Sequence, residues 1–338
     1  MNQQVTEKQH FVPKFYLRRF AEGNGLLTPL DVKTFLKRPR RHYSGVCYAS
    51  FFYAAKTGVK DTISQDIEKW LQQVESYVAK NIELAIPRII NMERITDDDR
   101  YSISVLLSML WLRSPNMRVQ LNQMEETMVQ QLFALDSEHH IDKYLRDTGT
   151  IWTKKERQGV VDMIKNKQYR LEFGNAQHLK FLVDSLGLGR EGFANLFYAK
   201  KWQIYISKGA SRFITSDSPV IEWFAPPTGF YGRDFLSRNH YLALTPEIFI
   251  ELTYPIGSEK IRRKTLFKKD DDMVMMFNHL IASHANEHAY SGDDEIISRM
   301  LEARKRPGVA EREYVERYER PWRDSKRRFE KSSNSRDA

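Results

Sequence analysis

The sequence predicts an α+β fold, in which a mostly helical middle at about residues 62–199 packs with a mainly antiparallel sheet from the second half of the chain. In the middle, apolar residues recur at intervals of three and four, which is the period of an amphipathic helix. After residue 200, short aromatic and β-branched segments alternate with Gly, Pro, Ser and Asp, as strands and turns do. No repeat or glycine-serine linker separates these parts, so we expect a single domain over residues 1–298.

The helices are predicted from their spacing and their first residues. A helix is expected from Thr62, and Pro87 is expected to interrupt it because proline lacks an amide hydrogen. Thr96 and the three aspartates after it predict the start of a long apolar helix that reaches about Pro115, since carboxylates stabilise the positive end of the helix dipole. Further helices are predicted at 116–134, 154–166 and 175–199, and from Asp270 to about Asn286.

The strands are predicted where short segments of β-branched and aromatic residues lie between turn residues. They are 202–207, 212–215, 220–224, 241–245, 248–252 and 288–290, with a strand or hairpin at 26–35 and a short buried element at 46–54. The chain then continues into a basic segment, 299–330, which we expect to be a helical extension. The last residues, 331–338, are so polar that we expect a frayed end.

Composition limits the class of protein. The chain has 338 residues, 41% of them hydrophobic, and can bury a full core. Its longest apolar run, 103–112, is about half of the roughly 20 residues that cross a bilayer, so we expect a buried helix and no membrane span. The N-terminus is polar and lacks an apolar signal region, and Cys47 is the only cysteine. Without a second cysteine no internal disulfide can form, which predicts a cytoplasmic location.

The charge is unevenly spread. The net charge is +9, and the first 43 residues carry nine basic and three acidic side chains. Residues 299–331 carry twelve basic and seven acidic ones. Two basic ends suit a phosphate-rich partner such as nucleic acid, because each Lys or Arg that neutralises a phosphate releases a counterion. In the C-terminal segment a solvated helix is favoured, since Glu313 and Arg317 have the spacing of an ordinary ion pair. The sequence indicates neither a protein partner nor an oligomeric state.

Several short motifs recur in a fixed order along the chain. The first combines a titratable ring, a proline, aromatics and arginines: Gln9, His10, Phe11, Val12, Pro13, Tyr16, Leu17, Arg18, Arg19 and Phe20. The others are Trp111-Leu112-Arg113-Ser114-Pro115, Trp202 with Arg212-Phe213-Ile214-Thr215-Ser216-Asp217-Ser218-Pro219-Val220, Leu244-Thr245-Pro246, and Asn278 after Met276. Their order and spacing resemble a bacterial family, the domain of unknown function 4238, over roughly residues 9–290. That name leaves the biochemical role open.

The motifs supply candidate site residues. His10 can act as a general acid or base, and Asp217, at a strand end before proline, can act as a base or hold Mg²⁺ or Mn²⁺. An Asx turn is the equally weighted alternative for Asp217, and a backbone-bonded histidine beside Pro13 is the alternative for His10. We predict His10, Arg113 and Asp217 as catalytic, Asp217 as metal ligand, and Tyr16, Arg18, Arg19, Ser216 and Asn278 as binding residues.

Three further patterns resemble functional sites. Glu68 and Glu75 share a helix face, where a surface stripe is favoured over a cleft. His284-Ala285-Asn286-Glu287-His288 matches the spacing of a zinc peptidase, but the predicted helix ends there, which favours an accidental match. Residues 187–192 match G-x-G-x-x-G, but no acid follows at the spacing of a dinucleotide site, so a helix-helix turn is favoured.

Two functional hypotheses follow. The first is a nucleic-acid-directed phosphodiester hydrolase, of phage defence or mobile elements, in which His10 and Arg18 lie near Asp217 in the fold. The second is a non-catalytic module that binds nucleic acid or protein through the basic N-terminal segment, with Asp217 purely structural. A zinc peptidase that uses His284 and His288 is a distant third.

Overall fold

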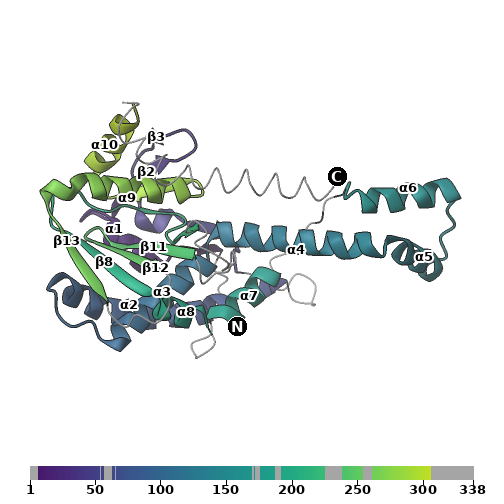
Figure 1. The fold of residues 1–338 in the computed structure, drawn as a ribbon, viewed down its shortest axis with the longest axis horizontal. Helices are drawn as coiled ribbons and strands as arrows, with labels where there is room; N and C mark the ends of the chain where they lie inside the picture. The colour runs from purple at the N-terminus through teal and green to yellow at the C-terminus, as the bar shows by residue number, and fades with distance from the viewer. Residues whose placement is uncertain are drawn as a thin grey trace, which may run out of the picture.

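The helices surround two sheets (Figure 1). The computed structural model describes residues 7–53, 55–56, 63–64, 66–169, 171, 176–186, 192–224, 238–253 and 261–305. The helices are α1 (Lys14–Phe20), α2 (Asp66–Ile90), α3 (Asp97–Leu112), α4 (Pro115–Leu135), α5 (Ser137–Thr148), α6 (Lys154–Lys165), α7 (Ala176–Leu186), α8 (Phe193–Ala199), α9 (Asp271–His284) and α10 (Asp294–Lys305), with short 3₁₀ turns η1 (Tyr43–Gly45) and η3 (Lys268–Asp270). The predicted α+β class is confirmed.

The strands are short, and most lie in two five-stranded sheets. They are β1 (Lys8–His10), β2 (Leu26–Asp31), β3 (Leu36–Lys37), β4 (Arg41–His42), β5 (Tyr48–Ser50), β6 (Ala55–Lys56), β7 (Ile63–Ser64), β8 (Lys201–Ser207), β9 (Thr215–Ser216), β10 (Ile221–Phe224), β11 (Arg238–Thr245), β12 (Ile248–Thr253), β13 (Arg262–Leu266) and β14 (His288–Ser291).

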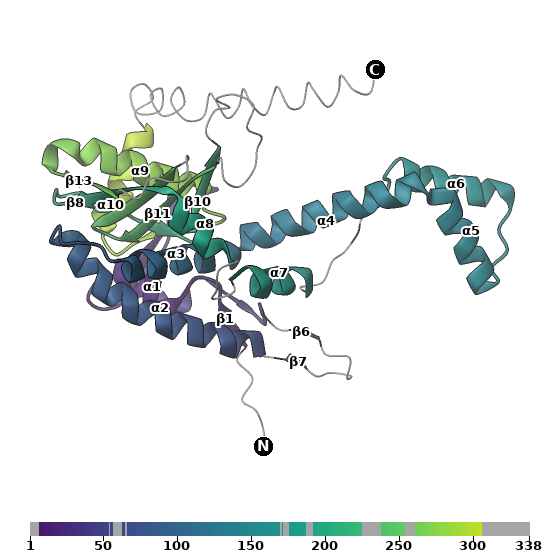
Figure 2. The same cartoon turned by 60° about the horizontal axis from the view of Figure 1, so that its bottom comes forward.

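The sheet with the longer strands, called the larger sheet below, comes from the second half of the chain, as predicted. Its strand order is β10-β11-β12-β8-β13, and every pair is antiparallel except β13 with β8. Helix α9 covers one face, where Phe277 stacks on Phe249 with ring centroids 4.2 Å apart. Helices α3 and α8 cover the other face, where the indole of Trp202 donates to the carbonyl of Phe197 (3.0 Å). Figure 2 shows these three layers, with α9 above the sheet and α3 below it.

The second sheet joins the two ends of the described chain. Its order is β3-β2-β14-β9, and β4 also pairs with β2. Strand β2, near the N-terminus, therefore pairs with β14, about 260 residues later. Helix α1 is bonded to the same region, because the Tyr16 hydroxyl donates to the carbonyl of Ala243 (2.6 Å) and contacts the Thr215 hydroxyl (2.9 Å). The N-terminal motif and the motif that contains Thr215 are therefore parts of one core.

Helix α3 is the central helix of that core. Its start is the predicted one, because Thr96 and Asp99 form a capping box, and its inner residues are buried on all sides. The predicted interruption of α2 at Pro87 is wrong, since α2 continues through Pro87 to Ile90. Pro87 lies in the last turn of α2, where little helix remains to be broken, and its carbonyl still accepts the amide of Asn91.

A helical arm projects from this core. Helix α4 leaves the body at Pro115 and carries α5 and α6 at its far end (Figures 1 and 2). Helix α5, over residues 137–148, was not among the predicted helices; it ends at Gly149, which adopts the left-handed conformation. The arm is the most extended part of the described molecule.

Other boundaries differ from the prediction. Of the predicted strand 212–215, only Thr215 lies in a strand, β9, and β13 was not predicted because basic residues interrupt its apolar pattern. Helix α10 crosses residue 298, the predicted end of the domain, while the rest of the extension and the tail, 306–338, lie outside the described residues. Among the described residues, no helix combines the length and the apolar character of a membrane span.

Candidate functional site

Arg113 ends α3 and is the centre of a buried polar cluster. Its Nε donates to the hydroxyl of Tyr53 (2.7 Å), one terminal nitrogen donates to Glu75 (2.5 Å), and the other donates to the carbonyl of His10. The side chain is almost fully buried. Burial opposes the charge, but Tyr53 and Glu75 outweigh it and hold the pKa of Arg113 above its ordinary value. All three sides of the guanidinium therefore have a partner inside the protein.

Two carboxylates of α2 face this arginine, so the favoured surface stripe for Glu68 and Glu75 is wrong. Glu75 forms the ion pair with Arg113. Burial raises the pKa of Glu68, while the charge of Arg113 lowers it in part. One carboxylate oxygen of Glu68, Oε2, is buried and has no hydrogen-bond partner. Gln72 bonds to the side chain of Glu68, so only Oε2 of this carboxylate is left without a partner. Tyr53 and the two glutamates are the members of the cluster that the motif resemblance did not include.

His10 lies beside the cluster as a neutral, backbone-bonded ring. Its Nε2 is 3.1 Å from the carbonyl of Ser44. Burial, followed by the charge of Lys14, lowers its pKa to about 4. This geometry matches the alternative reading of a histidine that is bonded to the backbone. Catalysis by His10 stays a prediction.

Asp217 holds a loop in place. Its Oδ1 accepts the amide of Asn286 (2.8 Å), and its Oδ2 accepts the amides of Glu287 (2.7 Å) and His288 (3.0 Å). Burial raises the pKa of Asp217, and the three amides counteract that shift. The groups that surround this carboxylate are hydrogen-bond donors, which are not metal ligands. The geometry therefore favours the structural alternative, and a Mg²⁺ or Mn²⁺ site at Asp217 stays a prediction without support from its surroundings.

Two further motif residues, Asn278 and Ser216, are also hydrogen-bonded within the protein. Asn278, on α9, accepts the amide of Ile214 (3.0 Å) and donates to the carbonyl of Arg212 (2.8 Å). Ser216 accepts the amide of Ser218 (3.2 Å) and lies in β9. These contacts fasten the chain before Asp217 to helix α9 and to the second sheet.

His10 and Arg18 were predicted to lie near Asp217, but among the described residues no hydrogen bond or ion pair between these side chains joins the two motifs. His10 faces Arg113 and Ser44, whereas Asp217 faces the loop at 286–288. Arg18 is exposed on α1. The direct bond between the two motifs is made by Tyr16 and Thr215. Tyr16 is fully buried, and burial raises its pKa above its ordinary value, so it packs the core.

The basic N-terminal segment is partly neutralised. Five of its nine basic residues form ion pairs with carboxylates, and their distances range from 2.6 to 3.8 Å. The pairs are Arg19 with Glu83, Lys33 with Glu287, Lys37 with Asp294, Arg38 with Asp31, and Arg40 with Glu22. Glu22 and Asp31 belong to the segment itself, so the carboxylates from outside, Glu83, Glu287 and Asp294, offset three of its six excess positive charges.

A second basic region lies at the edge of the larger sheet. Five of the nine residues from 261 to 269 are basic and none is acidic. We define the β13 edge surface as the exposed residues of this segment, Arg262, Lys264, Phe267, Lys268 and Lys269, together with the neighbouring exposed residue Lys208. Lys208 belongs to it because its amide donates to the carbonyl of Leu266 (2.8 Å). Within the described part of the chain, no ion pair includes any of these basic residues.

Two of the three acids that follow this region, Asp270 and Asp271, contact backbone amides, and Asp272 is exposed. Asp270 accepts the amide of Phe267 (2.9 Å), and Asp271 contacts the amide of Ser211 (3.4 Å). Gly209 packs so closely here that a Cβ atom would lie 2.5 Å from Asp271 and 3.2 Å from the backbone of Phe267. Phe267 itself is 54% exposed between lysines. The run of basic residues was visible in the sequence, but the fold was needed to show that it is unpaired.

The zinc and dinucleotide patterns gain no support. Helix α9 ends at His284, and His288 lies in β14, so the two histidines do not share a helix as a zinc peptidase requires. Among the described residues, no group of three or more His, Cys, Asp or Glu side chains is arranged to hold a metal ion. Of the glycine pattern, residues 187–191 lie outside the described residues, and the segment before it is helix α7.

Comparison with known proteins identifies the family. A family model described as a protein of unknown function (DUF4238) matches residues 8–295, so the chain belongs to this family, as the motif resemblance indicated. Searches of curated proteins and of solved structures found no match.

Proposed function

We propose that the protein is a nucleic-acid-binding module that holds single strands on the β13 edge surface. The observation that carries this proposal is the set of exposed basic residues, Lys208, Arg262, Lys264, Lys268 and Lys269, that have no carboxylate partner among the described residues. Unpaired Lys and Arg side chains attract phosphates because binding releases the counterions of the nucleic acid.

The exposed phenyl ring of Phe267 favours single strands over duplex. It lies between Lys264 and Lys268 in the sequence and is half exposed. A base can stack on such a ring only when it is unpaired, and stacking on aromatic side chains contributes about 1–3 kcal/mol per base. The surface therefore combines the two elements of non-specific single-strand binding, a basic track and an aromatic platform.

The test measures binding of labelled single-stranded DNA, single-stranded RNA and duplex DNA by fluorescence anisotropy over a range of salt. Replacing Lys268 and Lys269 with Ala should weaken single-strand binding and reduce the salt slope by about 1.4, at about 0.7 per phosphate contact. Phe267→Ala should weaken binding about tenfold, which corresponds to about 1.4 kcal/mol. Comparison of the DNA and RNA strands identifies the preferred polymer.

The matched control is Lys154→Ala with Lys155→Ala, an adjacent, exposed lysine pair at the start of α6. It removes the same net charge at a distant place. Equal loss of binding in the control and in the β13 variant would mean that net charge, not this surface, causes binding. Absence of binding to all three nucleic acids at low salt would reject the proposal.

A phosphodiester hydrolase is the second candidate, and one observation favours it. Glu68 has a raised pKa and a buried carboxylate oxygen without a partner, close enough to Arg113 for the charge of Arg113 to counteract that rise. A carboxyl group whose pKa is raised is better suited to act as a general acid than an ordinary glutamate. In this function Glu68 would donate a proton to the leaving group, and Arg113 would act as a positioning residue behind it, because all three sides of its guanidinium are bonded inside the protein.

Cleavage of the same labelled strands, with and without magnesium or manganese, tests this candidate. Glu68→Gln should abolish cleavage and leave strand binding unchanged, since Glu68 lies on α2 and outside the β13 edge surface. No cleavage under any condition, or full cleavage by the variant, would reject the hydrolase.

A cytoplasmic location and a role in phage defence remain proposals from the single cysteine and from the resemblance.

A further inference from the structure

The outer half of helix α4 exposes an apolar stripe that the body does not cover. Among the described residues, nine of the fifteen exposed large hydrophobic side chains lie between Val119 and Met163, on the arm. On α4 itself, Met124 is 64% exposed, Met128 61%, Leu132 55% and Leu135 84%. Soluble monomers seldom gather exposed apolar side chains in this way, and such patches usually mark an interaction site.

The stripe has the spacing of a helix-pairing seam. Met117, Leu121, Met124, Met128, Gln131 and Leu135 follow one another at intervals of four, three, four, three and four residues. This alternation places one row of side chains toward a partner helix, and a single polar residue in the row is a known device for fixing register. Met117 is buried in the body, so only the outer part of the row is free.

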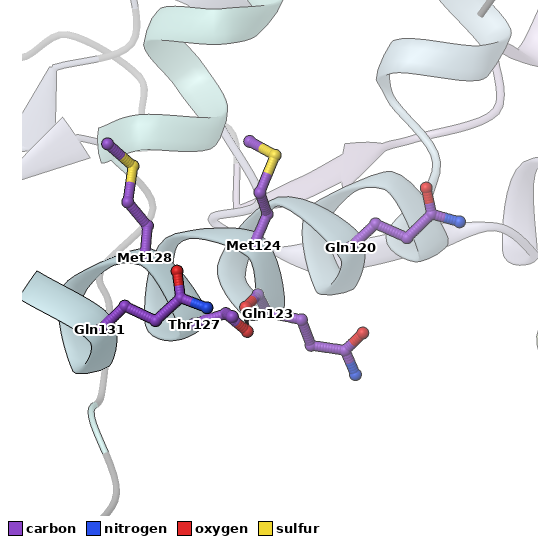
Figure 3. Close-up of a pocket in the computed structure, with 6 residues that line it drawn as sticks. All are labelled: Gln120, Gln123, Met124, Thr127, Met128 and Gln131. Atoms are coloured by element: carbon purple, nitrogen blue, oxygen red, sulfur yellow. Dashed lines mark hydrogen bonds between the residues drawn. The ribbon is translucent and has the colours of Figure 1, made fainter. Parts of the chain in front are cut away.

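The outer face has uncharged side chains along this row, and Glu125 lies at its flank, about 100° around the helix from Met124. It forms a shallow hollow lined by Gln120, Gln123, Met124, Thr127, Met128 and Gln131, and Figure 3 shows Met124 and Met128 pointing to the same side. The acidic residue Glu126 belongs to the opposite side, where it accepts the amide of Leu171 (3.4 Å). An uncharged row can meet an identical row without burying an unpaired charge.

We propose that this seam, the side chains of Met124, Met128, Gln131 and Leu135 on α4, binds the same seam of a second copy of the chain. Charge favours this occupant over the chain's own C-terminal segment, because residues 299–331 carry twelve basic side chains and none of the four seam residues is acidic. A two-fold pairing buries the same patch on both copies. The seam is small beside the roughly 800 Å² per partner of a standard interface, so the dimer should dissociate on dilution.

Sedimentation velocity of the full-length protein over a range of concentrations tests the pairing. The native chain should show a concentration-dependent dimer, and Met124→Lys with Met128→Lys should weaken it at least tenfold, because pairing would bury four extra charges. Both side chains are exposed, so the variant monomer should fold, which circular dichroism checks. The matched control is Tyr77→Lys with Leu84→Lys on α2, which are 45% and 53% exposed and add the same charge.

A cysteine cross-link gives a second readout. The only native cysteine, Cys47, is buried, so an introduced Gln131→Cys is the one accessible thiol expected. Mild oxidation should produce a covalent dimer from Gln131→Cys and none from Lys69→Cys, an exposed position on α2. A native chain that stays monomeric at all concentrations, a dimer that the Met124 and Met128 variant leaves intact, or equal cross-linking at both positions would overturn the proposal.

Discussion

The family motifs and the β13 edge surface use polar side chains in opposite ways. Arg113, Asp217 and Asn278 lie inside the fold, and each is bonded to the backbone or to buried side chains. Lys268 and Lys269 are exposed and belong to no ion pair of the described residues. The residues that identify the family are thus those that hold the fold, while groups that are free to meet a ligand lie elsewhere.

The largest expected effect concerns Arg113. Arg113→Ala should lower the free energy of unfolding by about 3–5 kcal/mol, because Glu75 and the buried hydroxyl of Tyr53 lose their partner. Urea unfolding measures this change, and Arg18→Ala, on the exposed side of α1, is the control that should leave stability within about 0.5 kcal/mol. If Arg113→Ala kept full stability and lost an enzymatic activity, the comparison would fail and the catalytic prediction would be supported.

The next effect concerns Asp217. Asp217→Ala leaves the amides of Asn286, Glu287 and His288 without an acceptor, so we expect a loss of about 3 kcal/mol in the free energy of unfolding. Hydrogen exchange should show the loop at 286–288 opening first. Ser218→Ala, in the same turn, serves as the control with a small loss. Unchanged protection of these amides in Asp217→Ala would contradict the anchoring role.

A pH effect of similar or smaller size comes from two buried histidines. Burial lowers the pKa of His10 and of His178 to about 4, from 6.5. Between these pH values the unfolded chain binds protons that the folded chain does not, so stability should fall as pH drops from about 6.5 to 4. The expected loss is a few kcal/mol in total. Thermal unfolding at several pH values measures it, and His178→Gln should flatten the curve; an equally steep curve would exclude His178 as a cause.

The smallest effect on stability is expected at the β13 edge surface. Lys268→Ala with Lys269→Ala should change the free energy of unfolding by less than about 0.5 kcal/mol, because both side chains are solvated. Nucleic-acid binding should nevertheless weaken, as measured by anisotropy. A variant that lost stability instead of binding would show that this surface belongs to the fold in the same way as the motifs do.

Local patterns allowed much of the fold to be predicted. The capping box at Thr96, the strands β8, β11 and β12 and the helix α9 are set by residues close in the sequence. Strand β13 was missed because its pattern is basic, and α5 because its apolar residues are few. The continuation of α2 past Pro87 was missed because the cost of proline depends on how many turns follow it.

The candidate site was predicted less well, for a physical reason. A sequence shows which side chains can titrate or bind, but their partners lie far along the chain. The amides that hold Asp217 come about 70 residues later, and the Glu75 that pairs with Arg113 comes about 40 residues earlier. The charge of the N-terminal segment likewise meets carboxylates as distant as Asp294.

The sequence by itself determined the family, the α+β class and the identity of the motifs, because these depend on residue order and on local periodicity. Only the tertiary structure decided which polar groups are spent on the fold and which remain open. That division depends on burial and on contacts between distant segments, as with Tyr16 and Thr215 or with the exposed seam of α4. A charged or apolar residue acquires its role from what packs against it, and local sequence does not contain that information.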